Sequence, residues 1–257
     1  QDAADTHPDL ATWLSSGAVR ERFPAVQPDR GALFVPRGGA VNVGAMVRAL
    51  LNAAERRGAT VETQAPVLYW RETPGAAVVE VDRGDDTEEL RADRVLLALG
   101  QGYPPFPELR RLGLDGVKGQ TVRVRRPKPL SDSLPPMSGR GYIVPEGDTL
   151  VLGSNYENNF DDLSPTPDAT AYIQEKTSDL IPGVQRAEVR GEVAGVRVKH
   201  SATNRPLLGP LPRRERLWAF TALGSKGLLT APILALNLPN LLNSPGKIPD
   251  TVSTRGG

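Results

Sequence analysis

The spacing of hydrophobic residues predicts one clear helix in the first quarter of the chain. Residues 43–57 have a helical period, with an apolar face formed by Met46, Leu50, Leu51 and Ala54. Asn42 is expected to cap this helix, and Gly58 to end it. The pattern therefore predicts a surface helix that lies on a core.

Shorter segments with alternating polar and apolar residues predict antiparallel strands in two groups. The first group forms a small meander of residues 60–69, 76–82 and 88–91, and the second forms another sheet of residues 120–125, 141–145 and 149–153. A helix is predicted over residues 167–180, because a proline fits its first turn, and a further strand over 189–198.

Residues 94–100 form a continuous apolar run instead. Such a run is typical of a strand buried on both faces of a parallel sheet, so we expect it in the middle of a sheet. It ends in Gly100-Gln101-Gly102, which begins like the Gly-x-Gly-x-x-Gly dinucleotide-binding turn. Tyr103-Pro104-Pro105 then replaces the third glycine and cannot supply the helix that holds a pyrophosphate. The segment is either a turn beside a ligand or a plain loop.

The chain ends in a predicted strand, a glycine-rich turn and an apolar helix, over residues 218–242. Backbone N–H groups at a helix N-terminus can face an anionic ligand. Gly224 and Gly227 would allow its close approach, because neither carries a Cβ. A plain strand-to-helix connection remains the alternative.

The composition of the chain argues against several classes of function. The 257 residues can form one or two domains, and no apolar stretch reaches the roughly 18 residues of a membrane span. The sequence has 31 Lys plus Arg and 30 Asp plus Glu. The protein therefore has no large positive net charge that would attract nucleic acid. The sequence has no cysteine and only two histidines, so we predict no metal site and no thiol chemistry. Its acidic start lacks the apolar region of a signal peptide, and the expected compartment is the cytoplasm.

Nine segments, in order, resemble the D-amino-acid oxidase-like family of FAD-dependent oxidoreductases, which includes glycine and sarcosine oxidases and the oxidase half of a bifunctional tRNA-modifying enzyme. They are residues 19–24 (VRERFP), 31–36 (GALFVP), 38–39 (GG), 92–100 (ADRVLLALG), 118–120 (KGQ), 141–145 (GYIVP), 151–156 (VLGSNY), 195–197 (GVR) and 204–210 (NRPLLGP).

The resemblance implies a mixed α/β (α+β) fold with an incomplete Rossmann-like FAD-binding domain and an antiparallel-sheet substrate domain. The substrate domain would comprise an entry segment, 1–36, and residues 116–200. The FAD domain would comprise 37–115 and a closing strand and helix in 201–257. The implied activity is oxidation of an amine or amino acid by hydride transfer to non-covalent FAD.

The resemblance also implies roles for individual residues. Arg197 matches the arginine that binds the substrate carboxylate, and Tyr142 matches an aromatic over the substrate; an exposed strand arginine and a core tyrosine are the alternatives. The turn near the pyrimidine end of the flavin matches Gly224, Ser225, Lys226, Gly227, Leu228 and Leu229. Ala98 and Gly100 match a contact near the phosphates, and Val67 lies near the adenine side.

The sequence departs from the family in three places. Asn204 replaces a frequent aspartate and Ser225 an occasional histidine, so the amine or amino-acid substrate stays open. The family's first strand, Gly-x-Gly-x-x-Gly turn and helix are missing, which would lower FAD affinity by about 2–4 kcal/mol. FAD binding by this chain alone is therefore expected to be weak or absent.

The missing unit would also leave residues 95–99 at a sheet edge, which an upstream segment or a partner chain should cover. Two alternatives to an oxidase completed in this way remain. One is a flavin-free binding or structural module, and the other is a tRNA-modifying oxidase domain, against which the balanced charge argues. We assign no proton acceptor, and the electron acceptor stays open.

Overall fold

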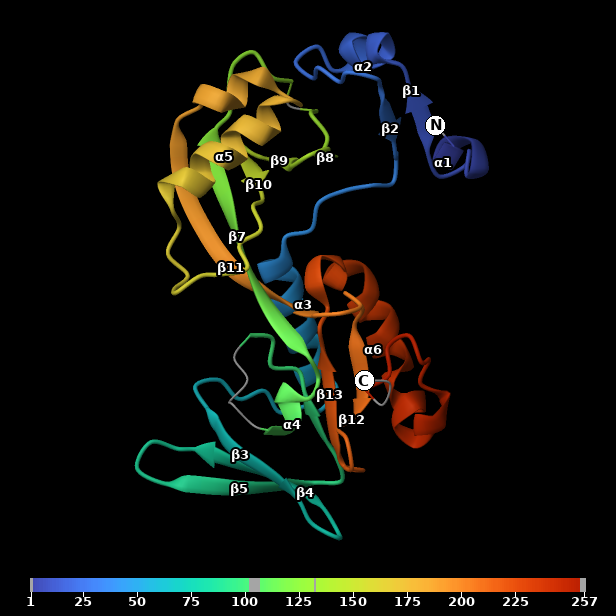
Figure 1. The fold of residues 1–257 in the computed structure, drawn as a ribbon, viewed down its shortest axis with the longest axis vertical. Coiled ribbons are helices and arrows are strands. Elements are labelled where there is room, and N and C mark those ends of the chain that lie inside the picture. Colours follow the sequence, from blue (N-terminus) through green and yellow to red (C-terminus); the bar gives the residue numbers. More distant parts are fainter. Residues whose placement is uncertain (1, 102–106, 132, 255–257) are drawn as a thin grey trace. The chain divides into compact units, whose positions relative to one another are not determined.

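The computed structural model describes residues 2–101, 107–131 and 133–254, which form a mixed α/β fold (Figure 1). The chain divides into two compact units, and each unit is built from two separate segments. The first unit contains residues 1–54 and 118–195, and the second contains residues 55–117 and 196–257. Within the described ranges, no helix is long and apolar enough to cross a membrane.

A five-stranded sheet forms the centre of the first unit, in the order β11-β7-β10-β9-β8. Its strands are β7 (Leu114–Arg125), β8 (Met137–Ser138), β9 (Tyr142–Glu146), β10 (Thr149–Gly153) and β11 (Val189–His200), of which β7 and β11 continue into the second unit. β9 and β10 form an antiparallel hairpin, and β10 also pairs with β7. The second sheet predicted from the sequence is confirmed.

Helix α5 (Pro167–Ser178) packs on this sheet, and the 3₁₀ helix η1 (Pro182–Arg186) follows it. Thr166 caps α5, because its side chain accepts a hydrogen bond from the Ala169 N–H at 3.3 Å. Ile173 of α5 is fully buried, as are Leu150 and Leu152 of β10. Alternation along β10 thus directs its apolar side chains toward the helix.

The start of the chain adds a small layer to the first unit. It contains α1 (Asp2–Thr6), α2 (Ser16–Arg22) and a two-stranded sheet of β1 (Thr12–Leu14) and β2 (Ala32–Phe34). Val19 of α2 and Val26 join the buried cluster of the five-stranded sheet.

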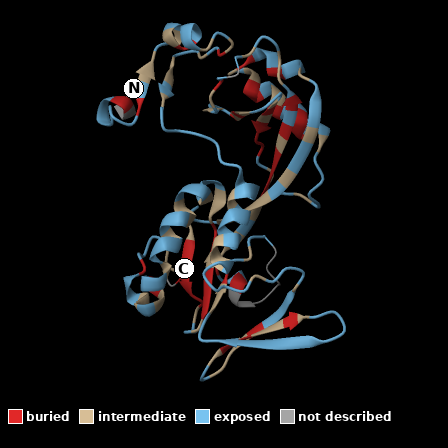
Figure 2. Ribbon diagram, turned by 180° about the vertical axis from the view of Figure 1, so that it is seen from behind, coloured by how far each residue is buried: buried red, intermediate tan, exposed pale blue. Residues whose placement is uncertain are grey.

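Helix α3 (Val43–Glu55) has the predicted ends but not the predicted environment. The Asn42 side chain accepts a hydrogen bond from the Ala45 N–H at 2.9 Å, and the Gly58 N–H bonds to the Glu55 carbonyl at 2.9 Å. No residue of α3 is buried, however, and Leu50 is 62% exposed (Figure 2). The prediction that this apolar face lies on a core is wrong for the described residues: Met46 and Ala54 are half-buried, but Leu50 and Leu51 are exposed.

The second unit contains two three-stranded sheets. One is the predicted meander of β3 (Val67–Glu72), β4 (Ala77–Asp82) and β5 (Thr87–Ala92). The meander is confirmed, but its first strand begins at Val67 and not at the predicted residue 60. The other has the order β12-β13-β6, from β12 (Leu207–Pro210), β13 (Leu217–Thr221) and β6 (Val95–Leu97). Helix α6 (Gly227–Asn243) packs on the latter sheet through a cluster that includes the buried Trp218 and Leu241. The short α4 (Pro107–Arg110) and η3 (Pro245–Lys247) complete the unit.

Strand β6 is parallel to its neighbour, as predicted, but it does not lie in the middle of the sheet. It pairs in parallel with β13, as its continuous apolar sequence predicted. It is nevertheless an edge strand and not a central one, and only Leu97 among its residues is buried. Its outer edge has no strand partner among the described residues, so the expected exposed edge is observed.

Candidate functional site

The parallel pair β6 and β13 sets the geometry of the candidate cofactor site. Val95 pairs with Leu217 and Leu97 with Ala219, so both strands end at the same edge of the sheet. The other end of the pair is fixed by Glu72, whose carboxylate accepts hydrogen bonds from the Glu215 and Arg216 N–H groups at 3.1 Å. Arg216 in turn donates to the Asp93 carbonyl at 3.2 Å and accepts the Val95 N–H at 2.9 Å, so the segment that leads into β13 is tied to the start of β6.

The loop after β13 leads directly into a helix N-terminus. It passes through Gly224 and the 3₁₀ helix η2 (Gly224–Lys226), and α6 begins at Gly227. No side chain caps α6, so its first N–H groups are not satisfied by a capping side chain. The structure therefore places the predicted turn, Gly224 to Leu229, where backbone donors can meet a ligand.

Two glycines line this edge of the sheet with open space above them. Gly100 and Gly224 have φ angles of +56° and +54°, which side chains rarely adopt. A methyl group built on Gly100 would meet nothing within 4 Å, and one on Gly224 only the Lys199 Cβ at 3.9 Å. Ala98, two residues before Gly100, is exposed. The parallel pairing thus brings Ala98, Gly100 and the Gly224 turn to one edge.

The remaining predicted cofactor residues are placed differently. Val67 begins β3, in the other sheet of the unit, where it pairs with Val81. Sheet pairing therefore does not group Val67 with the glycine turns. Gly102 and the prolines after it, predicted as a turn, lie outside the described residues.

The residues at this edge fit one end of an FAD molecule. Positive-φ glycines beside open space and an uncapped helix start suit the close approach of a flat ring with a partly negative edge. No Gly-x-Gly-x-x-Gly sequence occurs in the 257 residues, and Ala98 and Gly100 are the residues at this edge that are predicted to lie near the phosphates. A cavity of about 10 Å³ between Leu97, Leu109 and Ala219 holds at most about one water molecule and is no ligand site.

Tyr142, a predicted substrate residue, begins β9 in the first unit and is half-buried. It pairs across the hairpin with Gly153. A methyl group built on Gly153 would overlap the Cζ and hydroxyl oxygen of Tyr142 and lie 2.7 Å from its Cε1. The phenol ring therefore lies directly over the backbone of Gly153, which can only be a glycine in this arrangement.

Arg197, the predicted carboxylate-binding residue, lies on β11, next to the buried Val198. It is half-buried and belongs to the second unit, whereas Tyr142 belongs to the first. Their predicted roles at one substrate remain predictions.

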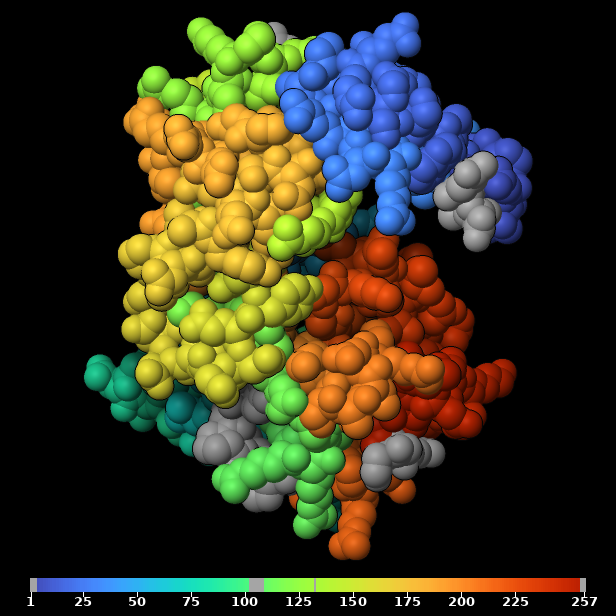
Figure 3. Space-filling model, turned by 45° about the horizontal axis from the view of Figure 1, so that its top comes forward, coloured from blue at the N-terminus to red at the C-terminus, as the bar shows by residue number. Residues whose placement is uncertain are grey.

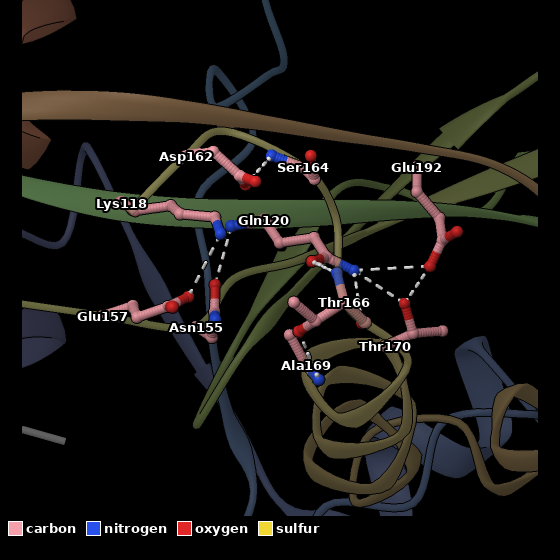
Figure 4. A network of polar contacts seen from close by, with 10 residues as sticks. All are labelled: Lys118, Gln120, Asn155, Glu157, Asp162, Ser164, Thr166, Ala169, Thr170 and Glu192. Carbon is pink, nitrogen blue, oxygen red and sulfur yellow. Dashed lines mark hydrogen bonds and ion pairs between the residues drawn. The ribbon is translucent and has the colours of Figure 1, made fainter. Parts of the chain in front are cut away.

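A buried polar network in the first unit was not predicted (Figure 4). The side chain of Gln120, fully buried on β7, bonds to Thr166, Thr170 and Glu192. The Gln120 N–H also donates to the Asn155 side chain at 2.6 Å. The network ties β7 to α5, to β11 and to the loop after β10.

Sequence reasoning also missed Lys176, which is 7% exposed on α5. The spacing of Ala169, Ile173 and Lys176 is helical and places the lysine on the buried face. That spacing was the available signal.

With this geometry described, comparison with known proteins decides the family. A family model described as FAD dependent oxidoreductase matches residues 1–238. The chain belongs to this family. The resemblance found in the sequence is thereby confirmed.

Individual members of the FAD dependent oxidoreductase family give the same result. The chain is 31% identical to the glycine oxidase of Pseudomonas aeruginosa, over 90% of this chain and 64% of that protein. It is 30% identical to the tRNA 5-methylaminomethyl-2-thiouridine biosynthesis bifunctional protein MnmC of Idiomarina loihiensis, over 89% of this chain and 37% of that protein. The glycine oxidase structure from Bacillus cereus superposes with a TM-score of 0.79 at 24% identity, covering 96% of this chain and 68% of that one. The chain thus spans only part of these relatives.

Proposed function

We propose that this chain forms part of an enzyme that oxidises a small amine or amino acid by hydride transfer to FAD. The observation that carries the proposal is the shared edge of β6 and β13, where Gly100 and the Gly224 turn face open space before an uncapped helix. Bound FAD would accept the hydride. The chain's own residues would bind and orient the flavin and the substrate.

Each predicted residue has a physical role in this proposal. The turn from Gly224 to Leu229 would present N–H groups and the Lys226 charge to the pyrimidine end of the flavin. Ala98 and Gly100 would lie near the phosphates, and Val67 near the adenine. Arg197 would pair with both oxygens of a substrate carboxylate, and Tyr142 would cover the substrate.

We also propose that further polypeptide, from the same protein or a partner chain, completes the FAD site. On α6, Leu229, Ile233 and Leu236 are 63–81% exposed, and the orange-to-red segment that contains α6 forms part of the surface (Figure 3). Apolar residues in such a row are expected to be covered. The greater length of the relatives supports the same expectation.

The test uses the protein at its full natural length, loaded with FAD. Flavin reduction is followed under anaerobic conditions with glycine, sarcosine and methylamine, which lacks a carboxylate. Two charge-assisted hydrogen bonds, at roughly 1.5–3 kcal/mol each, predict a loss of at least about 100-fold in kcat/KM for the amino acids in Arg197→Ala. Methylamine turnover should change far less.

Arg190→Ala is the matched control, because Arg190 lies on the same strand and, among the described residues, forms an ion pair with the exposed Glu188, at 3.1 Å. Equal losses for Arg197→Ala and Arg190→Ala would contradict the assignment of Arg197. A full-length protein that binds no flavin would contradict the oxidase proposal and favour a flavin-free module.

The similarity to MnmC favours a second candidate, a tRNA-modifying oxidase. The first unit has a hollow of about 850 Å³ whose charged lining residues are Arg125, Arg126, Lys128, Arg186, Asp148 and Glu188. If tRNA is the substrate, Lys128→Glu with Arg186→Glu should weaken tRNA binding at low salt. Oxidation of free glycine at the same rate in the presence and absence of tRNA, with no tRNA binding, would exclude this candidate.

A further inference from the structure

The ammonium group of Lys176 is buried against the backbone of the loop after β10. Its Nζ donates a hydrogen bond to the Ser154 carbonyl at 2.8 Å and lies 5.1 Å from the centre of the Tyr172 ring. Within the described part of the chain, no carboxylate forms an ion pair with it. Burying an ammonium group is costly, and the hydrogen bond to the Ser154 carbonyl and the nearby Tyr172 ring offset part of that cost.

The carbonyl that Lys176 holds belongs to the residue after Gly153, over which the Tyr142 ring lies. The start of β9, at Gly141, packs closely against the same backbone and against α5. A methyl group built on Gly141 would lie 2.7 Å from the Gly153 carbonyl oxygen, 2.7 Å from Thr177 Cγ2 and 3.2 Å from Lys176 Cε. Helix α5, the end of β10 and the start of β9 are therefore packed without room for one additional carbon atom.

We propose that Lys176 is a positioning residue for Tyr142. The ammonium fixes the Ser154 carbonyl, the carbonyl fixes the backbone of Gly153, and this backbone supports the phenol ring. An apolar side chain of the same length would fill the space but would remove the hydrogen bond that the Ser154 carbonyl accepts from Lys176. The positioning stands on geometry alone; its effect on catalysis rests on the proposed function, in which Tyr142 covers the substrate.

The first test observes Tyr142 directly in the full-length protein loaded with FAD. 3-Fluorotyrosine is incorporated at position 142, and its ¹⁹F resonance is recorded in wild type, Lys176→Met and Lys176→Arg. We expect Lys176→Met to shift or broaden the resonance, and Lys176→Arg, which keeps a cationic donor, to remain closer to wild type. Lys247→Met, at an exposed lysine, is the matched control. Lys176→Gln replaces Lys176→Met if the latter does not fold.

The second test measures whether Lys176 acts through Tyr142. In the full-length oxidase, Lys176→Met should raise KM by about tenfold with little change in kcat, and by less than about twofold in a Tyr142→Ala background. A purely structural role predicts the same factor in both backgrounds.

The outcomes separate the two proposals. An unchanged ¹⁹F resonance in Lys176→Met overturns the positioning role, whatever the enzyme oxidises. A shifted resonance in a protein that oxidises no amine supports the positioning role and refutes the proposed function. A shifted resonance with equal KM changes in both backgrounds overturns the claim that Lys176 acts on substrate binding through Tyr142.

Discussion

Replacing Gln120 with methionine removes the amide that joins β7 to α5 while keeping a side chain of similar length. In the wild type, the amide oxygen accepts a hydrogen bond from the Thr166 N–H at 2.8 Å. The amide nitrogen donates to Thr170 Oγ1 at 2.6 Å, to the Thr166 carbonyl at 3.2 Å and to Glu192 Oε1 at 3.3 Å. Every hydrogen-bonding group of this fully buried amide is therefore used.

The loss of stability in Gln120→Met depends on which polar groups lose their only hydrogen-bond partner. Thr170 keeps a partner, because its hydroxyl also donates to Glu192. The Thr166 carbonyl also keeps a partner, because it accepts the Thr170 N–H at 3.1 Å. The Thr166 N–H loses its acceptor, and a buried group without a partner costs roughly 1–3 kcal/mol. Since Thr166 is only half-buried, the lower part of that range applies, and we expect the free energy of unfolding of the first unit to fall by about 1–2 kcal/mol.

Urea unfolding of the full-length protein, followed by circular dichroism, measures this loss. With a denaturant dependence of about 1–3 kcal/mol per molar urea, the midpoint of the affected transition should fall by about 0.5–1 M. Hydrogen exchange at the start of α5 should accelerate as well. Gln185→Met, at an exposed glutamine, is the control. If both variants unfold at the same urea concentration with equal exchange at α5, the reasoning about Gln120 is refuted.

Two further predictions concern the first unit. Gly153→Ala should lower the melting temperature and move the Tyr142 ring, because the new methyl group overlaps the phenol. Gly191→Ala is the control, because its methyl group would have nothing within 4 Å. Equal melting temperatures of the two variants would contradict the packing of Tyr142 on Gly153. The Ser164 backbone N–H, and then its side chain, lower the pKa of Asp162 below its ordinary value of 3.8. Its carboxylate therefore stabilises the fold above that pH, and the contribution is lost as the pH falls through the lowered pKa. Asp162→Asn should reduce the melting temperature at neutral pH, with the difference from wild type shrinking as the pH falls below the ordinary value of 3.8. A difference that is the same at neutral and at acidic pH would argue against this role.

The sequence predicted those elements whose causes are local. Asn42 caps α3 and Thr166 caps α5 because a side-chain oxygen reaches an N–H group three residues away. The apolar run before Gly100 predicted a parallel strand, and its pairing with β13 brings Gly100 and Gly224 to one edge. Most of the candidate cofactor edge could thus be predicted from patterns within single segments.

The sequence could not predict features that depend on which segments cover one another. The face of α3 around Leu50 has the apolar spacing of a helix that packs on a core. This spacing does not identify the part of the protein that would pack against the face. Strand β6 has the composition of a central strand and lies at an edge for the same reason. The helical spacing of Lys176 indicates its buried position, but not the Ser154 carbonyl that accepts its hydrogen bond, because a contact between segments distant in sequence has no periodic pattern.

The division of the chain into interleaved segments has a consequence for its synthesis. The second unit is interrupted by residues 118–195, so β6 leaves the ribosome long before β13, its parallel partner. Until β13 is synthesised, residues 95–97 lack the strand with which they pair in the folded protein. The nascent chain therefore exposes an apolar segment that is prone to aggregation. The second unit therefore folds only after the inserted segment has been translated, and chaperones that bind short apolar stretches are expected to associate with the nascent chain around residues 94–99 during that interval.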